Sequence, residues 1–316
     1  MSKLKFINLD AADTVWFSRQ LESIDETDYT ELLPGNLARR YIPDVQGVAE
    51  WAPVYTYRQF SGRGRSRVGA GPDSDDAPRI TLVGREASRT IKSIENSYSW
   101  TVREIQQAAG TRTPLDTLTV MMARVATDRE TDILLALGNS DYDIEGLLSL
   151  SAVDPADSTP TAKTSGTKWA TAANTPDQIL ADINKVTTSL FQGLRQTDAP
   201  AFQKFVLLVP TDAYARIATT PRSSTSDTTI LQFALQNNPW LESIEPWYHC
   251  DTAGAGGVGR LVAYPRNPLA LGGLVPQDFK TLAPQERNTS IVVPSMASCG
   301  GVVCRYPVAV RYMDDV

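Results

Sequence analysis

Histidine and cysteine are the residues that most directly limit the chemistry this chain could perform. The sequence contains one histidine, His249, and three cysteines, Cys250, Cys299 and Cys304. Zinc sites and most nucleophilic triads need several such residues in one place. Because His249 and Cys250 are adjacent, in a strand their side chains would point to opposite faces and could not share a metal. We therefore expect a structural histidine and buried free thiols.

A glycine-rich segment offers a second possible site. Gly254–Gly259 fits the Gly-x-Gly-x-x-Gly pattern of dinucleotide-binding loops. That function needs a helix to begin directly after the last glycine, because the helix N-terminus holds the pyrophosphate. The next residues, Arg260–Tyr264, instead indicate a strand, and Pro265 and Pro268 disfavour a helix. The pattern predicts a flexible hairpin loop, with a dinucleotide-binding enzyme as an alternative.

Three aspartates, Asp73, Asp75 and Asp76, resemble the start of a calcium-binding loop. The position that should hold glycine is Pro78, and the position that should hold a bidentate glutamate is Gly84. A solvated acidic turn is the better interpretation. The sequence thus predicts no metal site, no cofactor and no catalytic residue.

These aspartates belong to an unusual extended region. Val54–Phe60 alternates aromatic and β-branched residues and predicts a strand, and Arg79–Val83 predicts a second one. The tract between them has almost no apolar side chains. The pattern indicates a two-stranded ribbon with a long tip, and such a ribbon is marginally stable alone. Something outside the ribbon must therefore support it.

Arginines along this ribbon are the candidate contact residues, because a guanidinium pairs well with carboxylates or phosphates. They could form a solvated basic loop, dock onto acidic surface of a neighbouring copy, or touch nucleic acid. We favour docking between copies, with the acidic cluster near the N-terminus as a partner. The candidates are Arg58, Arg63, Arg65, Arg67, Arg79, Asp25, Glu26, Asp28 and Glu31.

The rest of the chain predicts an α+β fold. A capped helix is expected over 113–138, with Met122 on its buried face and Gly138 at its end. A second helix over Pro176–Arg195 opens an α/β unit at 175–285, and residues 290–293 and 301–312 predict a terminal hairpin. We therefore expect an arm (1–47), the ribbon region (48–97), a region with the long helix (98–174), the α/β unit and terminal strands (286–316), the last returning to the long-helix region.

Composition excludes several classes of protein. Thirty Lys and Arg against 36 Asp and Glu give a net charge of −6, which disfavours a generally basic nucleic-acid binder. A hydrophobic content of 42% indicates a folded chain. We expect no membrane span and no secretory signal, because the apolar runs are short.

The order of arm, arginine-bearing ribbon, long capped helix, α/β unit and terminal strands resembles one known family. Together with Ser93–Trp100, Arg103–Ala109 and Asp128–Leu135, it is similar to the major capsid proteins of tailed double-stranded DNA bacteriophages with the Hong Kong 97-type fold. Some members of that family cross-link through a lysine in the ribbon. This chain has no lysine between Lys5 and Lys92, so the covalent link is doubtful here.

The resemblance implies a structural protein and not an enzyme. Copies would assemble as pentamers and hexamers into an icosahedral shell, the virion capsid, built in the host cytoplasm. The ribbon would be the E-loop that lies across an adjacent subunit, and 98–174 and 175–285 would be the peripheral and axial domains. The implied partners are the chain itself, possibly separate scaffold, portal and decoration proteins, and weakly contacted double-stranded DNA. An encapsulin-like compartment of the same fold is the alternative.

Overall fold

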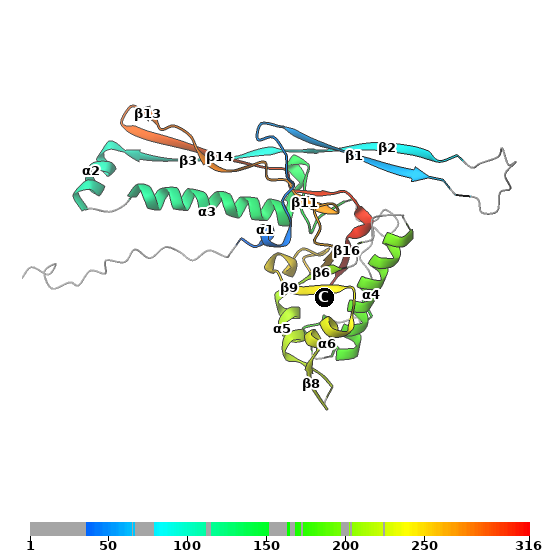
Figure 1. Ribbon diagram of the computed structural model, residues 1–316. Coiled ribbons are helices and arrows are strands. Elements are labelled where there is room, and N and C mark those ends of the chain that lie inside the picture. Colours follow the sequence, from blue (N-terminus) through cyan, green and yellow to red (C-terminus); the bar gives the residue numbers. More distant parts are fainter. Residues whose placement is uncertain are drawn as a thin grey trace, which may run out of the picture. The chain divides into compact units, whose positions relative to one another are not determined.

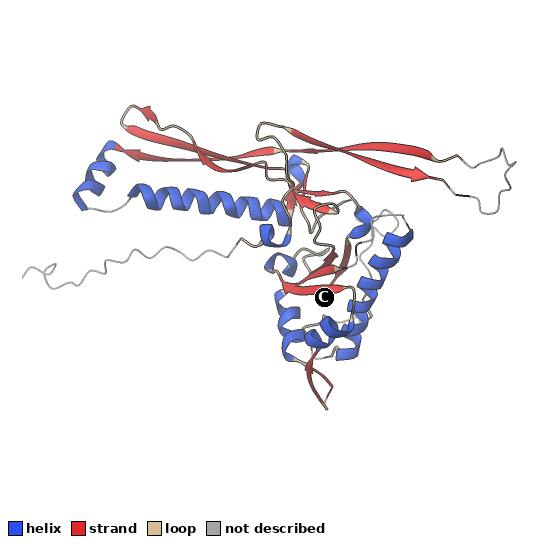
Figure 2. Ribbon diagram, viewed as in Figure 1, coloured by secondary structure: helices blue, strands red, loops and turns tan. Residues whose placement is uncertain are grey.

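The computed structural model describes residues 36–64, 66, 79–111, 115–151, 163–164, 168–171, 173–196, 202, 204–223 and 225–316 (Figure 1). The chain divides into two units, Met1–Gly35 and Asn36–Val316, and the description concerns the second. The acidic candidates and the ribbon tip lie outside the described residues. Within the described part, Figure 2 shows both long helices and long paired strands, as the α+β prediction requires.

A run of five apolar residues forms the centre of a small sheet. These residues make β6 (Phe205–Val209), which is buried along its whole length. β6 pairs in parallel with β9 (Leu241–Pro246) and antiparallel with β10 (Arg260–Tyr264). β10 in turn pairs antiparallel with β16 (Arg311–Asp314), which gives the order β16-β10-β6-β9.

Three helices contact strands of this sheet. They are α4 (Pro176–Gln196), α5 (Thr211–Thr219) and α6 (Ile230–Asn237). The predicted apolar face of α4 is confirmed, because its residues at helical spacing are all buried: Ile179, Ile183, Val186, Leu190 and Leu194. At the start of α6, the side chains of Thr229 and Gln232 each accept a hydrogen bond from the other residue's backbone N–H, which forms a capping box.

The predicted long helix is confirmed as α3 (Leu115–Ala136), which lies along one face of an antiparallel sheet (Figure 1). In this sheet β14 (Ser290–Cys299) pairs with β3 (Lys92–Thr101) on one edge. On its other edge it pairs with β12 (Gln277–Thr281) and β13 (Gln285–Arg287). The helix α2 (Val102–Thr111) follows β3 directly.

Contacts between α3 and β3 are partly polar. Asn96 Nδ2 donates to the carbonyl of Ala123 at 3.0 Å and to Thr127 Oγ1 at 2.9 Å. Trp100 Nε1 donates to Thr119 Oγ1 at 3.3 Å. These bonds fix the register of the helix on the strand.

The buried face of α3 differs from the prediction. Met122 was expected to be buried, but it is 41% exposed. The buried side chains lie in the C-terminal half of the helix: Thr127, Thr131, Asp132, Leu134, Leu135 and Ala136. Helical periodicity identifies residues that share a face but cannot say whether the chain itself covers that face. A charge at position 122 would therefore reach solvent and is expected to leave folding intact.

The predicted ribbon is confirmed and is longer than expected. β1 (Val54–Arg63) and β2 (Thr81–Thr90) pair antiparallel over their full lengths, from Val54 opposite Thr90 to Arg63 opposite Thr81. Only Ile91 separates β2 from β3, so the chain passes directly from the ribbon into the sheet. No sequence pattern predicted β3, in which serines alternate with Tyr98 and Trp100 toward the end of the strand.

The predicted terminal hairpin is wrong. Residues 290–293 belong to β14, whose ten-residue pairing with β3 is far longer than a local hairpin could offer. The later stretch divides into three parts: β15 (Val302–Cys304), which pairs with β11 (Leu271–Gly273), the 3₁₀ turn η4 (Pro307–Ala309) and β16. Gly301, with φ at +69°, lies at the break between β14 and β15, which both pair antiparallel with the segment from β11 to β12.

Short elements complete the described chain: α1 (Ala38–Tyr41), β4 (Gly138–Asn139), η2 (Ser140–Tyr142), β5 (Ile144–Glu145), β7 (Pro221–Ser223), β8 (Ser226–Thr229) and η3 (Tyr248–Asp251). Gly138, with φ at +71°, directly follows Leu137 at the end of α3, as predicted for a helix stop. Among the described helices, none has the length and apolar character needed to cross a bilayer.

Candidate contact surface on the ribbon

The base of the ribbon is anchored to its own chain by aromatic residues. Tyr55 and Tyr57 pack against a small cluster of Ile91, Leu274 and Val303. The Tyr57 hydroxyl donates to the carbonyl of Cys304 at 3.2 Å, and Arg305 donates to the Tyr55 hydroxyl at 3.0 Å. The ribbon therefore leaves the body of the molecule in a defined direction.

An ion pair adds a second anchor at the same end. The Arg89 guanidinium contacts the Glu145 carboxylate of β5, with 20% and 14% of the two side chains exposed. On the opposite strand, Gln59 donates to the carbonyl of Arg305 and accepts a hydrogen bond from Arg85 at 2.7 Å. Residues of β1 beyond Gln59 take no part in these anchoring contacts.

Its outer half carries large apolar side chains in solvent. Phe60, Ile80, Leu82 and Val83 are all exposed in this chain. Proteins rarely leave apolar residues gathered on one projecting element unless that element makes a contact. The outer half of the ribbon is therefore the candidate contact surface.

The arginine candidates are placed only in part. Arg58 pairs with Glu86 across the two strands at 2.7 Å, and both side chains are exposed. Arg79 is exposed just before β2, and for Arg63 the structure describes the backbone alone. Arg65, Arg67 and the acidic candidates Asp25, Glu26, Asp28 and Glu31 lie outside the described residues. Sequence reasoning chose the arginines and missed the apolar residues between them.

The single histidine proves to be part of a buried polar junction. His249 Nε2 donates to Asp132 Oδ2 at 2.7 Å, and the Tyr248 hydroxyl donates to the same oxygen at 2.9 Å. The other oxygen of Asp132 accepts the backbone N–H of Ala38 at 2.7 Å, at the start of α1. One carboxylate therefore joins α1, α3 and η3.

Electrostatics at this junction favour an ionised carboxylate. Burial raises the pKa of Asp132, but hydrogen bonds from His249, the Ala38 N–H and Tyr248 together hold it below its usual value. Burial and the neighbouring Asp132 carboxylate raise the pKa of Tyr248 to about 12. The prediction of a structural histidine is confirmed. Its partner, Asp132, has a signal in the sequence, because it is a charged residue among the apolar residues at the end of α3.

His249 and Cys250 were expected to point to opposite faces of a strand, and this expectation is wrong. Both residues lie in the 3₁₀ turn η3, and both side chains are buried. Cys250, Cys299 and Cys304 are free and buried, as expected. Burial raises the pKa of Cys299 to about 11 and that of Cys304 to about 12, so neither thiol is activated as a nucleophile.

The glycine loop does not form a dinucleotide site. The Gly254 N–H donates to the carbonyl of Val258, which closes a tight turn, and Gly256 and Gly257 have positive φ values of +80° and +77°. β10 begins at Arg260, directly after the loop. A strand stands where a helix N-terminus is required, so the strand predicted after the loop is confirmed. The predicted hairpin is wrong, because β6 lies between β9 and β10 in the sheet.

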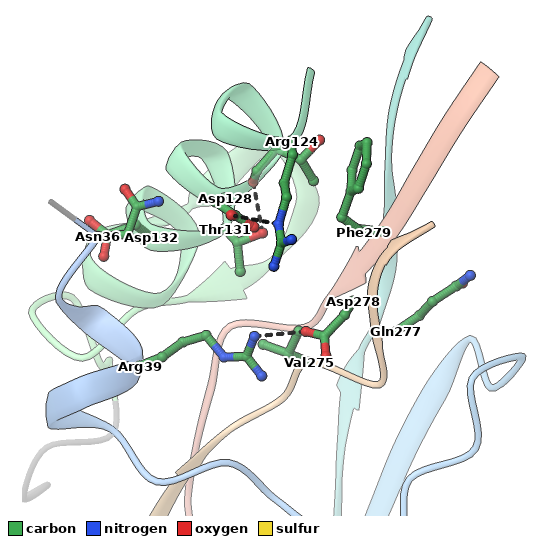
Figure 3. A pocket seen from close by; sticks show the side chains of 12 residues that line it. Asn36, Arg39, Arg124, Asp128, Thr131, Asp132, Val275, Gln277, Asp278 and Phe279 are labelled. Atoms are coloured by element: carbon green, nitrogen blue, oxygen red, sulfur yellow. Dashed lines mark hydrogen bonds and ion pairs between the residues drawn. The ribbon is translucent and has the colours of Figure 1, made fainter. Parts of the chain in front are cut away.

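A pocket of about 310 Å³ opens beside α3, near Asn36 (Figure 3). Arg39 crosses it and pairs with Asp44 and Asp278, each at 2.7 Å. Arg124 at its rim lies 3.7 Å from Asp128. The Thr127 and Thr131 hydroxyls that line the pocket donate to backbone carbonyls of their own helix. Within the described part of the chain no group of three metal-ligating side chains gathers. The pocket offers no catalytic constellation.

Comparison with known proteins agrees with the non-catalytic geometry. The family described as "Major capsid protein" matches residues 68–316. The capsid of Myoviridae phage XM1 superposes with a TM-score of 0.76 at 20% identity, covering 96% of this chain and 99% of that one. The capsid of a native GTA particle gives 0.68 at 8% identity, covering 94% and 96%. No curated protein matches the sequence.

Proposed function

Because the chain belongs to the major capsid protein family, we propose that its copies assemble as pentamers and hexamers into an icosahedral shell around double-stranded DNA. The chain has the Hong Kong 97-type fold. It is a structural component of a virion capsid and not an enzyme, and a capsid requires that it associate with itself. The arrangement of the capsomers and the enclosed DNA are the proposed part.

One observation carries the proposal: the outer half of the ribbon exposes large apolar side chains that its own chain leaves uncovered. Single contacts made by such an element are weak, because association costs translational freedom and loop ordering. In a closed lattice each subunit is held by several neighbours at once, so the contacts reinforce one another. The ribbon would act as the E-loop that lies across an adjacent subunit.

We propose that the regions of the chain correspond to the parts of the Hong Kong 97-type capsid fold. Residues 1–47 would be the N-terminal arm, 48–97 the E-loop, 98–174 the peripheral domain and 175–285 the axial domain. Residues 286–316 would supply terminal strands, with β14 in the peripheral domain. β16 would complete the axial sheet, since it pairs with β10.

The arginines and acids remain proposed contact residues between copies. Replacing Arg63, Arg65 and Arg67 together with alanine should impair particle formation while leaving helix content unchanged by circular dichroism. The matched triple lysine variant keeps the charge and shows whether the planar guanidinium is needed. Normal particles from the alanine variant would remove these three residues from the contact.

The direct test of the shell is negative-stain microscopy of the purified protein after size exclusion. Capsomers or closed particles are the expected result. A stable monomer, under conditions in which the chain is folded, would contradict the proposal. Nuclease-protected DNA within particles would separate a virion shell from an encapsulin-like compartment, which would instead contain protein cargo. Separate scaffold, portal and decoration proteins are further proposed partners, and co-expression would reveal any dependence on them.

A further inference from the structure

One short segment lies between two layers of the molecule. The layers are the axial sheet, β16-β10-β6-β9, and the peripheral layer, defined here as α3 with its sheet of β3, β14, β12 and β13. The segment comprises Ala38–Val45, which is α1 and the four residues after it, and is called the key segment below. Its residues Ala38, Tyr41 and Ile42 are almost completely buried. Figure 1 shows α1 between α3 and β9, so the key segment can contact both layers.

Polar contacts bind one side of the key segment to the peripheral layer. The Ala38 N–H donates to Asp132 Oδ1 of α3 at 2.7 Å. The Arg39 guanidinium reaches Asp278 of β12 at 2.7 Å, and Figure 3 shows this ion pair beside α3. Arg39 also pairs with Asp44 at 2.7 Å. One guanidinium therefore holds both ends of the key segment beside β12.

Two tyrosines bind the other side of the key segment to the axial sheet. The Tyr41 hydroxyl donates to the carbonyl of Pro246 in β9 at 2.9 Å. The Tyr264 hydroxyl of β10 donates to the carbonyl of Tyr41 at 2.8 Å. The Tyr41 ring also meets the Trp247 ring edge to face, with centroids 5.4 Å apart. Because Tyr264 is fully buried, separating it from Tyr41 would leave a buried hydroxyl without this partner.

The key segment also pairs with β11, which lies in sequence between the two layers. The Val45 N–H donates to the carbonyl of Gly273, and the Gly273 N–H donates to the carbonyl of Pro43, both at 2.9 Å. A Cβ on Gly272 would come within 2.6 Å of Val45 Cγ2, and one on Gly273 within 3.3 Å of Ile42 Cγ2. Glycine at these two positions therefore allows an approach that a larger residue would prevent.

Contacts on three sides make the key segment resist rotation of one layer against the other. Such a rotation would separate Tyr41 from Pro246 or Ala38 from Asp132, and it would leave buried polar groups without partners. A close-packed interior also gives the Tyr41 ring no room to follow the motion. The layers can change their angle only when the key segment is displaced.

Two other contacts cross the same boundary. His249 bonds to Asp132, and the Tyr312 hydroxyl donates to the carbonyl of Leu147 at 2.6 Å. Each of these contacts acts at one point, and a single hydrogen bond permits rotation about itself. The key segment differs because it touches both layers along its length.

We propose that the key segment fixes the angle between the axial sheet and the peripheral layer, and that loss of its contacts turns this fixed joint into a hinge. Tyr41 acts on the axial side, and Ala38 and Arg39 act on the peripheral side. The inference is independent of the proposed shell, because it concerns the shape of a single chain.

Pulsed electron resonance on unassembled protein measures this angle. Spin labels at Glu130→Cys on α3 and Glu242→Cys on β9 would report the distance between the layers, because both positions are exposed and the native cysteines are buried. The otherwise unchanged chain should give one narrow distance distribution. Tyr41→Ala should widen it about twofold or more, because a hinge samples a range of angles. Tyr142→Ala, at a tyrosine that is 58% exposed, is the control and should leave it unchanged.

A narrow distribution from folded Tyr41→Ala protein would overturn the proposal, whatever its melting temperature. Tyr41→Phe covers the case in which the alanine variant does not fold, because it keeps the ring and removes only the hydroxyl that binds Pro246. It should speed hydrogen exchange of the Val45 and Gly273 amides about tenfold, because the key segment opens locally, and Tyr142→Phe should not. Equal exchange in the two phenylalanine variants, with equally narrow distance distributions, would likewise overturn the proposal.

Discussion

Strands β6 and β2 contain similar aliphatic residues but have opposite relations to solvent. Leu207 in β6 is fully buried by its own sheet and helices, whereas Leu82 in β2 projects into solvent. The first residue stabilises the single chain, and the second can contribute free energy only when another molecule covers it. An apolar strand therefore identifies a contact, and only the structure shows which chain completes it.

The largest effect should come from the same substitution made in both strands. Leu207→Ala leaves a cavity in the core and should lower the free energy of unfolding by about 3 kcal/mol or more. Leu82→Ala should change the unfolding of the unassembled chain by less than about 0.5 kcal/mol. Urea denaturation of capsomer or monomer fractions measures both. Similar losses would show that the ribbon is covered by its own chain.

The polar junction should produce the next largest effect. Asp132→Ala leaves His249, Tyr248 and the Ala38 N–H without their acceptor, and the cost should be about 3 kcal/mol. The same denaturation experiment measures it, with the exposed Asp141→Ala as control. A loss below that of the control would show that the junction contributes nothing to the fold.

Acid stability checks the charge state of this junction. The pKa of Asp132 lies below its ordinary value of 3.8 in the folded chain, so its ionised form contributes stability above about pH 4. That contribution is lost as the pH falls through the lower, folded-state pKa. Asp132→Asn should remove this part of the pH dependence, as measured by melting temperature between pH 2 and about pH 6. An unchanged profile would contradict the assignment.

Anchoring of the ribbon should depend on the partly buried ion pair. Arg89→Ala should cost about 1 kcal/mol or less in overall stability but speed hydrogen exchange of the backbone amides from Val54 to Gln59. Arg58→Ala removes the exposed pair with Glu86 and serves as the control, with little effect on exchange. Equal exchange in both variants would mean that the tyrosines alone hold the base of the ribbon.

The smallest effect is expected on the outer side of α3. Met122→Asp places a charge on a side chain that is 41% exposed, so folding should persist with a change of about 0.5 kcal/mol or less. Leu135→Asp on the same helix buries an unpaired charge and should prevent folding. Circular dichroism distinguishes the two. Unfolding of the Met122 variant would restore the face predicted from the sequence.

Short-range patterns in the sequence predicted helices and strands better than they predicted which strands pair. The periodicity of α4, the five apolar residues of β6 and the prolines after the glycine loop depend on neighbouring residues, and all three predictions were correct. The partner of β14 is β3, nearly two hundred residues away, and no local pattern encodes that pairing. The exposed apolar residues of the ribbon's outer half were missed for a related reason, because Phe60, Leu82 and Ile80 align on one face only after the strands pair.

The direct passage from β2 through Ile91 into β3 has a mechanical consequence. Ile91 is held by Leu274 and Val303, and its N–H donates to the carbonyl of Pro53. Tension applied at the ribbon tip therefore passes along one unbroken backbone into the ten-residue ladder between β3 and β14. Loading along the strands strains all the rungs of this ladder together, whereas peeling would break them one at a time.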